Sequence, residues 1–203
     1  MKKIKIGITG GIGSGKSELC KYYTEKGEKV IFADIVAKNI LSGNKTVQKK
    51  IIELFGKDSF EDGNPNLKYL AENIFKNEKN VKKMNSVVHP AAIDEIQKQM
   101  RLQLEKSDIV FVESALIYEA GMENLFDFIL AISAPDNLRI ERVAERDDAD
   151  PEEIKLRINN QLSEEFKVQN ADFVIHNNST IDELYKKAEF FLDLFKTICT
   201  SEI

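Results

Sequence analysis

The sequence has few of the residues on which disulfide-stapled and metal-binding proteins depend. Its 203 residues include two cysteines, Cys20 and Cys199, two histidines and no tryptophan. Two cysteines so far apart do not form a disulfide framework, and this usage is typical of a reducing compartment. These few side chains also cannot be combined into a zinc cluster with a sensible ligand spacing.

Long apolar runs are also lacking. No segment approaches the roughly 20 apolar residues of a membrane-spanning helix, and the basic start MKKIKIGITG has no apolar stretch of signal-peptide length. The net charge of −5 does not favour binding to nucleic acid or to an anionic membrane. We therefore expect a cytoplasmic protein with small-molecule partners, no nucleic-acid or membrane partner, and a monomeric or weakly homo-oligomeric state.

Short apolar runs alternate with amphipathic stretches along the chain. Strands that alternate with helices predict an α/β fold with a parallel five-stranded sheet covered on both faces. The predicted strands are residues 4–9, 29–33, 108–113, 127–133 and 172–175. The predicted helices are residues 16–27, 34–43, 45–55, 67–76, 79–86, 91–106, 135–146, 151–169 and 180–198.

The strands are unevenly spaced. About 75 residues, mostly helical in pattern, separate the second strand from the third, which is too many for one crossover helix. We interpret them as a helical insertion in a single domain that spans residues 1–203. The predicted parts are a core (about 1–40, 107–135 and 170–203), an insertion (about 41–106) and a helical lid (about 136–169).

The stretch GGIGSGKS, between a predicted strand and a predicted helix, matches the phosphate-loop pattern G-x-x-x-x-G-K-[ST]. Its glycines allow a tight turn whose N–H groups meet phosphate oxygens, and the following helix adds its positive dipole end. Lys16 supplies charge for the β- and γ-phosphates, and the Ser17 hydroxyl is a ligand for Mg²⁺. We therefore predict binding of a nucleoside triphosphate and Mg²⁺. The predicted nucleotide-binding residues are Gly10, Gly11, Ile12, Gly13, Ser14, Gly15, Lys16, Ser17 and Glu18.

Phosphate loops occur in several classes of protein. A switch GTPase is disfavoured, because the Asn-Lys pair in NKTV (44–47) lacks the aspartate of a guanine-binding motif. A motor or transporter ATPase stays a weak alternative, because the apolar run DIVFVE ends in Glu113. The length of the chain and its helical insertion favour a small-molecule kinase.

The stretch RIERVAER places three arginines, Arg139, Arg142 and Arg146, on one face of a predicted helix. Like charges at this spacing repel each other mildly, and a bound anion would relieve the repulsion. The alternative is a solvated helix face whose arginines pair with Glu141 and Glu145. We favour a mobile lid whose arginines shield the transferred phosphoryl group.

Asp34 follows the second predicted strand, at the carboxyl edge of the sheet where α/β folds bind their ligands. A carboxylate there could take the proton of an acceptor hydroxyl. It could equally cap the next helix. The residues alone leave both roles open.

The motifs of the chain resemble, in content and order, those of the dephospho-CoA kinases. These motifs are ITGGIGSGKS, Asp34 followed by IVAK, LFG, EDG, VVHP, LIYEAG, ERD, NNQ and ADFVIHNN. The resemblance covers nearly the whole chain, from about residue 3 to residue 200. The resemblance implies a phosphate-loop kinase that transfers the γ-phosphoryl group of ATP to the ribose 3′-hydroxyl of dephospho-coenzyme A. This reaction is the last step of coenzyme A synthesis.

The resemblance also implies roles for individual residues. Asp34 would be the general base, and Asn177 would lie near the adenine of ATP. The implied catalytic residues are Lys16, Asp34, Arg142 and Arg146. The implied acceptor-binding residues are Asp34, Lys68, His89, Leu116, Ile117 and Glu119, with Lys68 as the candidate for a charge that the family places one position earlier.

Two alternatives stay open because the chain departs from the family pattern at Phe32, Leu67 and Ala115. The first is a kinase for another nucleoside or nucleotide. The second is a non-catalytic regulator that binds ATP.

Overall fold

The structure is a computed structural model that describes residues 2–74 and 77–201. The chain forms two compact units. The first unit consists of residues 1–32 and 99–203, and the second consists of residues 33–98. Each unit has its own buried core.

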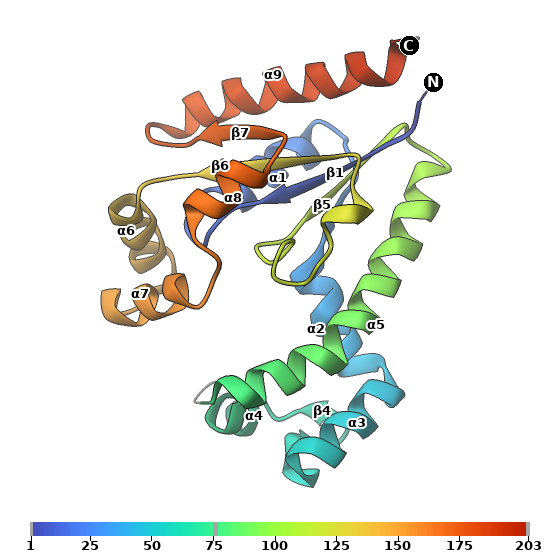
Figure 1. The fold of residues 1–203 in the computed structure, drawn as a ribbon, viewed down its shortest axis with the longest axis vertical. Coiled ribbons are helices and arrows are strands. Elements are labelled where there is room, and N and C mark those ends of the chain that lie inside the picture. Colours follow the sequence, from blue (N-terminus) through green and yellow to red (C-terminus); the bar gives the residue numbers. More distant parts are fainter. Residues whose placement is uncertain (1, 75–76, 202–203) are drawn as a thin grey trace. The chain divides into compact units, whose positions relative to one another are not determined.

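The first unit is built on a parallel five-stranded sheet, as the sequence predicts (Figure 1). Its strands follow the order β2-β5-β1-β6-β7, and every neighbouring pair is parallel. Their bounds are Ile4–Thr9 (β1), Val30–Phe32 (β2), Ile109–Glu113 (β5), Phe128–Ser133 (β6) and Phe173–His176 (β7). Because the strands are parallel, their carboxyl ends meet at one edge, where the phosphate loop follows β1.

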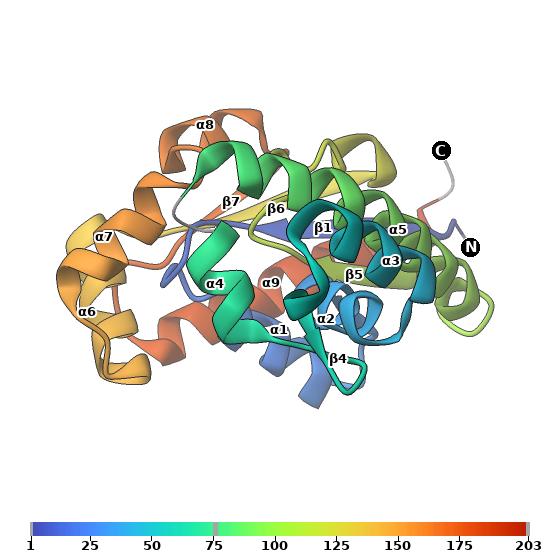
Figure 2. The ribbon, with the colours of Figure 1, turned by 90° about the horizontal axis from the view of Figure 1, so that it is seen from below.

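Helices cover both faces of this sheet (Figure 2). Helices α1 (Lys16–Glu25) and α9 (Ile181–Thr200) lie on one face, and α8 (Glu164–Asn170) lies on the other. The rings of Tyr23 and Phe111 lie 4.7 Å apart between α1 and β5, and Phe195 of α9 joins them. All three side chains are fully buried. A sheet buried on both faces needs apolar residues at consecutive positions, which explains the unbroken apolar run of β5 from Ile109 to Val112.

The second unit is mainly helical. It contains a two-stranded antiparallel sheet formed by β3 (Phe60–Glu61) and β4 (Asn64–Pro65). Its core is formed by Val47, Ile51, Leu70 and Ile74. The helices are α2 (Ala33–Gly43), α3 (Lys45–Phe55), the short η1 (Lys57–Ser59), α4 (Leu67–Ile74) and the part of α5 (Glu78–Leu104) up to residue 98.

One predicted helix boundary is wrong. The sequence predicts separate helices at 79–86 and 91–106, but α5 runs without a break through Pro90. Proline has no N–H to donate, so the helical hydrogen bond to the carbonyl of Ser86 is lost, and the helix continues on both sides of Pro90. The predicted end of the 67–76 helix falls at residues 75–76, which lie outside the described residues.

A second predicted helix, 151–169, is divided in the structure. Helix α7 (Pro151–Asn159) follows α6 (Asp136–Asp147), and α8 begins only at Glu164. The Ser163 side chain accepts a hydrogen bond from the Phe166 N–H at 3.1 Å, so it caps a new helix. Residues 160–163 are therefore a connection, and this connection contacts the phosphate loop.

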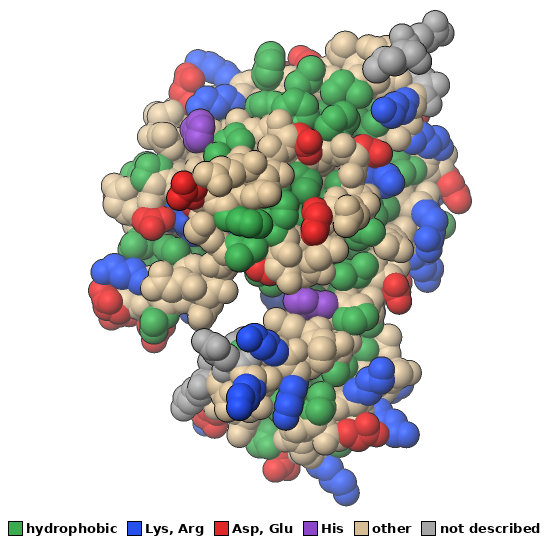
Figure 3. All heavy atoms as spheres, in the orientation of Figure 1, with side chains coloured by type: hydrophobic (Ala, Val, Ile, Leu, Met, Phe, Trp, Pro, Cys, Tyr) green, Lys and Arg blue, Asp and Glu red, His purple; other side chains and the backbone are tan. Residues whose placement is uncertain are grey.

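Charged side chains of both signs are interspersed over the visible face of the molecule (Figure 3). Within residues 2–74 and 77–201, the long helices are too polar for any of them to cross a membrane.

Candidate active site

The phosphate loop follows β1 and runs into α1. Gly10, Gly13 and Gly15 have φ angles of +146°, +78° and +103°, in the left-handed region that favours glycine. Space is also limited, because a Cβ atom on Gly15 would lie 2.3 Å from the Asn177 side-chain nitrogen. The loop therefore requires glycine at these positions for its backbone conformation.

Gly11 is a glycine for a different reason. Its φ angle is outside the left-handed region, but a Cβ atom there would lie 2.1 Å from Nη2 of Arg139. The same Cβ atom would lie 2.8 Å from Oε2 of Glu164. The glycine is required because two side chains from α6 and α8 approach the loop backbone closely.

Lys16, the first residue of α1, is 7% exposed. Its Nζ donates a hydrogen bond to the Gly11 carbonyl oxygen at 3.1 Å and lies 4.0 Å from Oε1 of Glu113. Glu113 ends β5 and is also 7% exposed. A buried cation and a buried carboxylate thus lie together at the carboxyl edge of the sheet, beside the positive dipole end of α1.

The loop also holds polar atoms that can bind phosphate. The hydroxyl groups of Thr9 and Ser14 are buried and have no hydrogen-bond partner in the described part of the chain. Ser17 and Glu18 are exposed on the first turn of α1, and the Glu18 carboxylate accepts a hydrogen bond from Tyr185 at 3.3 Å. Buried donors without partners, next to a glycine turn and a helix start, fit an anionic phosphate chain.

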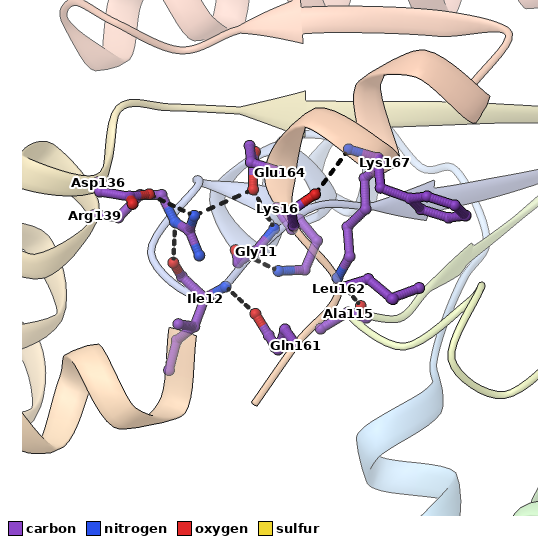
Figure 4. Close-up of polar contacts among 12 residues, drawn as sticks. Gly11, Ile12, Lys16, Ala115, Asp136, Arg139, Gln161, Leu162, Glu164 and Lys167 are labelled. Atoms are coloured by element: carbon purple, nitrogen blue, oxygen red, sulfur yellow. Dashed lines mark hydrogen bonds and ion pairs between the residues drawn. The ribbon is translucent and has the colours of Figure 1, made fainter. Parts of the chain in front are cut away.

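Arg139 of α6 is buried beside the phosphate loop and is not a solvated surface arginine (Figure 4). It is 2% exposed, and its Nε donates to the Ile12 carbonyl oxygen at 2.9 Å. Its Nη1 lies 2.9 Å from the Asp136 carboxylate and 3.3 Å from the Glu164 carboxylate. The guanidinium group therefore connects the base of α6 to the loop.

Arg142 and Asn177 form a second connection. The Arg142 Nη2 donates to the Asn177 carbonyl oxygen at 3.1 Å, and the Asn177 side chain donates to the Ser14 carbonyl oxygen at 2.9 Å. The Arg142 Nη1 is buried without a hydrogen-bond partner in the residues described. This nitrogen remains a donor for a ligand beside the loop.

Arg146 lies in a third environment. Its side chain is 58% exposed and forms two hydrogen bonds with Asp147, at 2.7 and 2.9 Å. The Arg146 guanidinium lowers the pKa of the Asp147 carboxyl below its ordinary value. The three arginines of α6 thus have different partners, and none of these partners is Glu141 or Glu145.

The segment after β5 contains three of the predicted acceptor-side residues. Leu116 is half-buried, and Ile117 is fully buried against Gly7 of β1. The Glu119 Oε1 accepts a hydrogen bond from the Leu162 N–H and forms an ion pair with Lys167 Nζ, both at 2.9 Å. Glu119 therefore holds the connection between α7 and α8 in place.

The other predicted acceptor-side residues belong to the second unit. Asp34 is exposed and is the second residue of α2, so it lies in the first helical turn rather than at the cap position before it. Lys68 is exposed on α4. His89 is half-buried in α5, and its burial lowers the pKa of its imidazole. The structure describes these residues within residues 33–98, whereas the phosphate loop belongs to the first unit.

Three further residues at or near this site were assigned no role from the sequence, although Gln161 lies in the NNQ motif. Gln161 accepts a hydrogen bond from the Ile12 N–H at 3.0 Å, Glu164 accepts one from the Gly11 N–H at 3.2 Å, and Lys167 is a fully buried cation. Ser163 is the residue that could have indicated the break between α7 and α8. A helix-capping residue within an otherwise helical stretch predicts that one helix ends and another begins there.

Comparison with known proteins decides between the classes of phosphate-loop protein. A family model described as dephospho-CoA kinase matches residues 4–183. This chain belongs to the dephospho-CoA kinase family. A dephospho-CoA kinase from Fusobacterium nucleatum is 38% identical over 189 residues, covering 93% of this chain and 96% of that protein.

Solved structures agree with this assignment. The structure of a dephospho-CoA kinase from Campylobacter jejuni matches with a TM-score of 0.72 and 29% identity, covering 93% of this chain and 95% of that one. TT1252 from Thermus thermophilus matches with a TM-score of 0.80 and 28% identity, covering 95% and 98%. The predicted phosphate-loop kinase fold and the phosphotransferase class are confirmed. The two alternatives, another nucleotide kinase and a non-catalytic regulator, are not favoured.

Proposed function

We propose that this dephospho-CoA kinase uses its phosphate loop to hold ATP and transfers the γ-phosphoryl group to the ribose 3′-hydroxyl of dephospho-coenzyme A. The observation that carries the proposal is the buried Lys16 ammonium group at the Gly11 carbonyl, in a chain that matches the family over residues 4–183. A buried cation at a glycine loop stabilises the charge that develops on a transferred phosphoryl group.

On the donor side, the N–H groups of the loop and the start of α1 would bind the phosphate oxygens. The Arg142 Nη1, which is buried and lacks a partner in the described chain, would donate to the nucleotide. Asn177 would hold this arginine and the loop together on the adenine side. Arg146 would leave Asp147 when the lid closes over the phosphates.

Among the described residues there is no group of three or more His, Cys, Asp or Glu side chains that could hold a metal ion. This suits Mg²⁺ that arrives with ATP and keeps most of its ligands from phosphates and water. The Ser17 hydroxyl would be its direct protein ligand, with the Glu113 carboxylate at one edge of the site. When bound, Mg²⁺ neutralises charge on the phosphates.

On the acceptor side, we propose that Asp34 accepts the proton of the 3′-hydroxyl as it attacks the γ-phosphorus. The proton moves to the carboxylate, the new O–P bond forms, and the bond to the ADP oxygen breaks. We propose that residues 41–106 bind the acceptor, with contacts from Lys68, His89 and the 116–119 segment. Residues 136–169 would form the lid.

Two variants test the two halves of this proposal. Lys16→Ala should abolish ATP binding in calorimetry, whereas Lys21→Ala, which removes an exposed lysine from the same helix, should bind normally. Asp34→Asn should lower kcat by at least about a hundredfold and leave ATP binding unchanged, because only the proton acceptor is lost. Asp58→Asn, an exposed change in the same unit, is the matched control.

The acceptor is tested by ADP release against a panel of dephospho-coenzyme A, nucleosides and nucleotides. Rapid release with dephospho-coenzyme A alone, and a product phosphorylated at the 3′ position by NMR, are the expected results. Faster release with another nucleoside would refute the acceptor assignment, and ATP binding without release would refute catalysis.

We also propose that the protein acts in the cytoplasm as a monomer or weak homo-oligomer without nucleic-acid or membrane partners. Light scattering after gel filtration tests the oligomeric state, and a stable higher oligomer would contradict it.

A further inference from the structure

Three successive peptide units of the phosphate loop are each held by a side chain from residues 139–164 (Figure 4). The Gly11 N–H donates to Glu164 at 3.2 Å, and the Ile12 N–H donates to Gln161 at 3.0 Å. The Ile12 carbonyl accepts from Arg139 at 2.9 Å. A loop with several glycines has many accessible conformations, so side chains that fix consecutive peptides reduce its freedom where phosphate is expected to bind.

The middle peptide connects Gln161 to Lys16. The Gly11 carbonyl and the Ile12 N–H belong to one planar trans unit, so their bonds point in opposite directions. The carbonyl accepts from Lys16 Nζ at 3.1 Å and from the Ser14 N–H at 3.2 Å. On the other side the N–H donates to Gln161. Because the unit is rigid, the side chain that holds its N–H also sets the direction of the oxygen that orients Lys16.

The chemistry of Gln161 fits this role. An N–H requires an acceptor, so the amide oxygen of Gln161 must face Ile12. Hydrogen bonds in a chain polarise one another, so Gln161 also makes the Gly11 oxygen a better acceptor for the ammonium group. Gln161 adds no charge to the site, unlike Glu164, whose carboxylate is paired with the buried Arg139.

Gln161 is itself held in place. The N–H of Gln161 donates to the Ile158 carbonyl at 3.0 Å, and the next residue, Leu162, donates to the Glu119 carboxylate at 2.9 Å. Glu119 is paired with Lys167, which is fully buried and also donates to the Ala115 carbonyl at 2.7 Å. The ion pair and the Leu162 hydrogen bond meet at one oxygen of Glu119, so the connection is anchored on the segment after β5.

We propose that Gln161 is a positioning residue that orients the Lys16 ammonium group through the Gly11–Ile12 peptide, anchored by the Glu119–Lys167 pair. The inference rests on the proposed phosphoryl transfer. The proposal further implies that the segment after β5 and the phosphate loop are linked by the hydrogen bonds and the ion pair of residues 161–167.

The test compares Gln161→Met, which keeps the length of the side chain but removes the acceptor, with Gln161→Glu, which keeps an acceptor oxygen. Gln161→Met should lower kcat about tenfold or more, with KM for ATP changed less than threefold, because a misoriented Lys16 acts mainly on the transition state. Gln161→Glu should keep a higher kcat and raise KM for ATP through its added charge. Gln169→Met, the same change on an exposed residue of α8, is the matched control.

A readout on Lys16 separates this inference from the proposed function. In ATP-free protein, the ¹⁵N signal of Lys16 Nζ and the hydrogen exchange of the Ile12 amide should both change in Gln161→Met and stay unchanged in Gln169→Met. An unchanged Lys16 signal, or equal losses of kcat in the Met and Glu variants, would overturn the inference. Failure of the wild-type protein to phosphorylate dephospho-coenzyme A would refute only the proposed function. If Gln161→Met lowers the melting temperature into the assay range, Gln161→Asn, whose oxygen is too short to reach Ile12, replaces it.

Discussion

Gly11→Ala is a substitution whose cost can be worked out from contacts in the structure. The added Cβ atom would lie 2.1 Å from Nη2 of Arg139, far inside van der Waals contact. The guanidinium group must therefore retreat by about 1 Å or more, which breaks its 2.9 Å hydrogen bond to the Ile12 carbonyl. Overpacking costs about 1–3 kcal/mol and a lost hydrogen bond to a buried charge about 1.5–3 kcal/mol. We therefore expect Gly11→Ala to lower the free energy of unfolding by about 2.5–6 kcal/mol if both costs apply in full, and to weaken ATP binding.

Urea unfolding and titration calorimetry with ATP measure the two effects. Gly43→Ala is the matched control, because Gly43 is exposed at the end of α2 and a Cβ atom added there would have nothing within 4 Å. That variant should be neutral or more stable by up to about 1 kcal/mol. Arg139→Lys removes Nη2 and keeps the charge. In a protein that carries Arg139→Lys, Gly11→Ala should therefore lower the free energy of unfolding by less than it does in the wild-type protein. An equal loss of stability in the two proteins would refute the clash with Arg139 as the cause of the destabilisation.

Three further predictions concern stability and reactivity. Asn44→Ala should destabilise the protein by about 1 kcal/mol in urea unfolding, because the Asn44 side chain accepts from two N–H groups at the start of α3, each at 3.1 Å; no change would show that the cap is dispensable. Burial lowers the pKa of His89 in the folded protein, so the protonated form favours the unfolded chain, and stability should fall as the pH drops below about 6.5 and through the folded pKa. His89→Gln should flatten this part of the stability–pH curve, and an unchanged slope would contradict the assignment. Burial raises the pKa of the Cys20 thiol, and Cys199 is also buried, so a thiol reagent at neutral pH should label the protein fully only in urea; rapid labelling of the native protein would contradict their burial.

The regular elements could largely be predicted because their signals are local. All five strands begin and end within one residue of their predicted bounds, since buried parallel strands require short, mainly apolar runs that can be found in the sequence. Pro90 misled the prediction because a proline at a helix start and one inside a long helix look alike in sequence. The neighbouring turns of α5, which span residues 78–104, decide between them.

In the candidate site, too, some residues could be predicted from local patterns and others could not. Gly10 to Ser17 could be identified because the glycines, the lysine and the hydroxyl are adjacent in the chain. Asp34 and the arginines of α6 could be proposed as functional, but their partners could not be foreseen. Arg139 pairs with Glu164, which is 25 positions away, and spacing along one helix carries no information about such a contact.

By itself, the sequence determined the class of protein: a phosphate loop between strand and helix, a parallel sheet and a helical insertion, because short-range patterns encode each of these features. Only the tertiary structure decided how the loop is held. Gln161 contacts Ile12 across 149 positions of chain, and Glu119 anchors the neighbouring Leu162 across 43. Contacts of this kind depend on folding two distant segments onto one sheet edge, and no local pattern of residues specifies them.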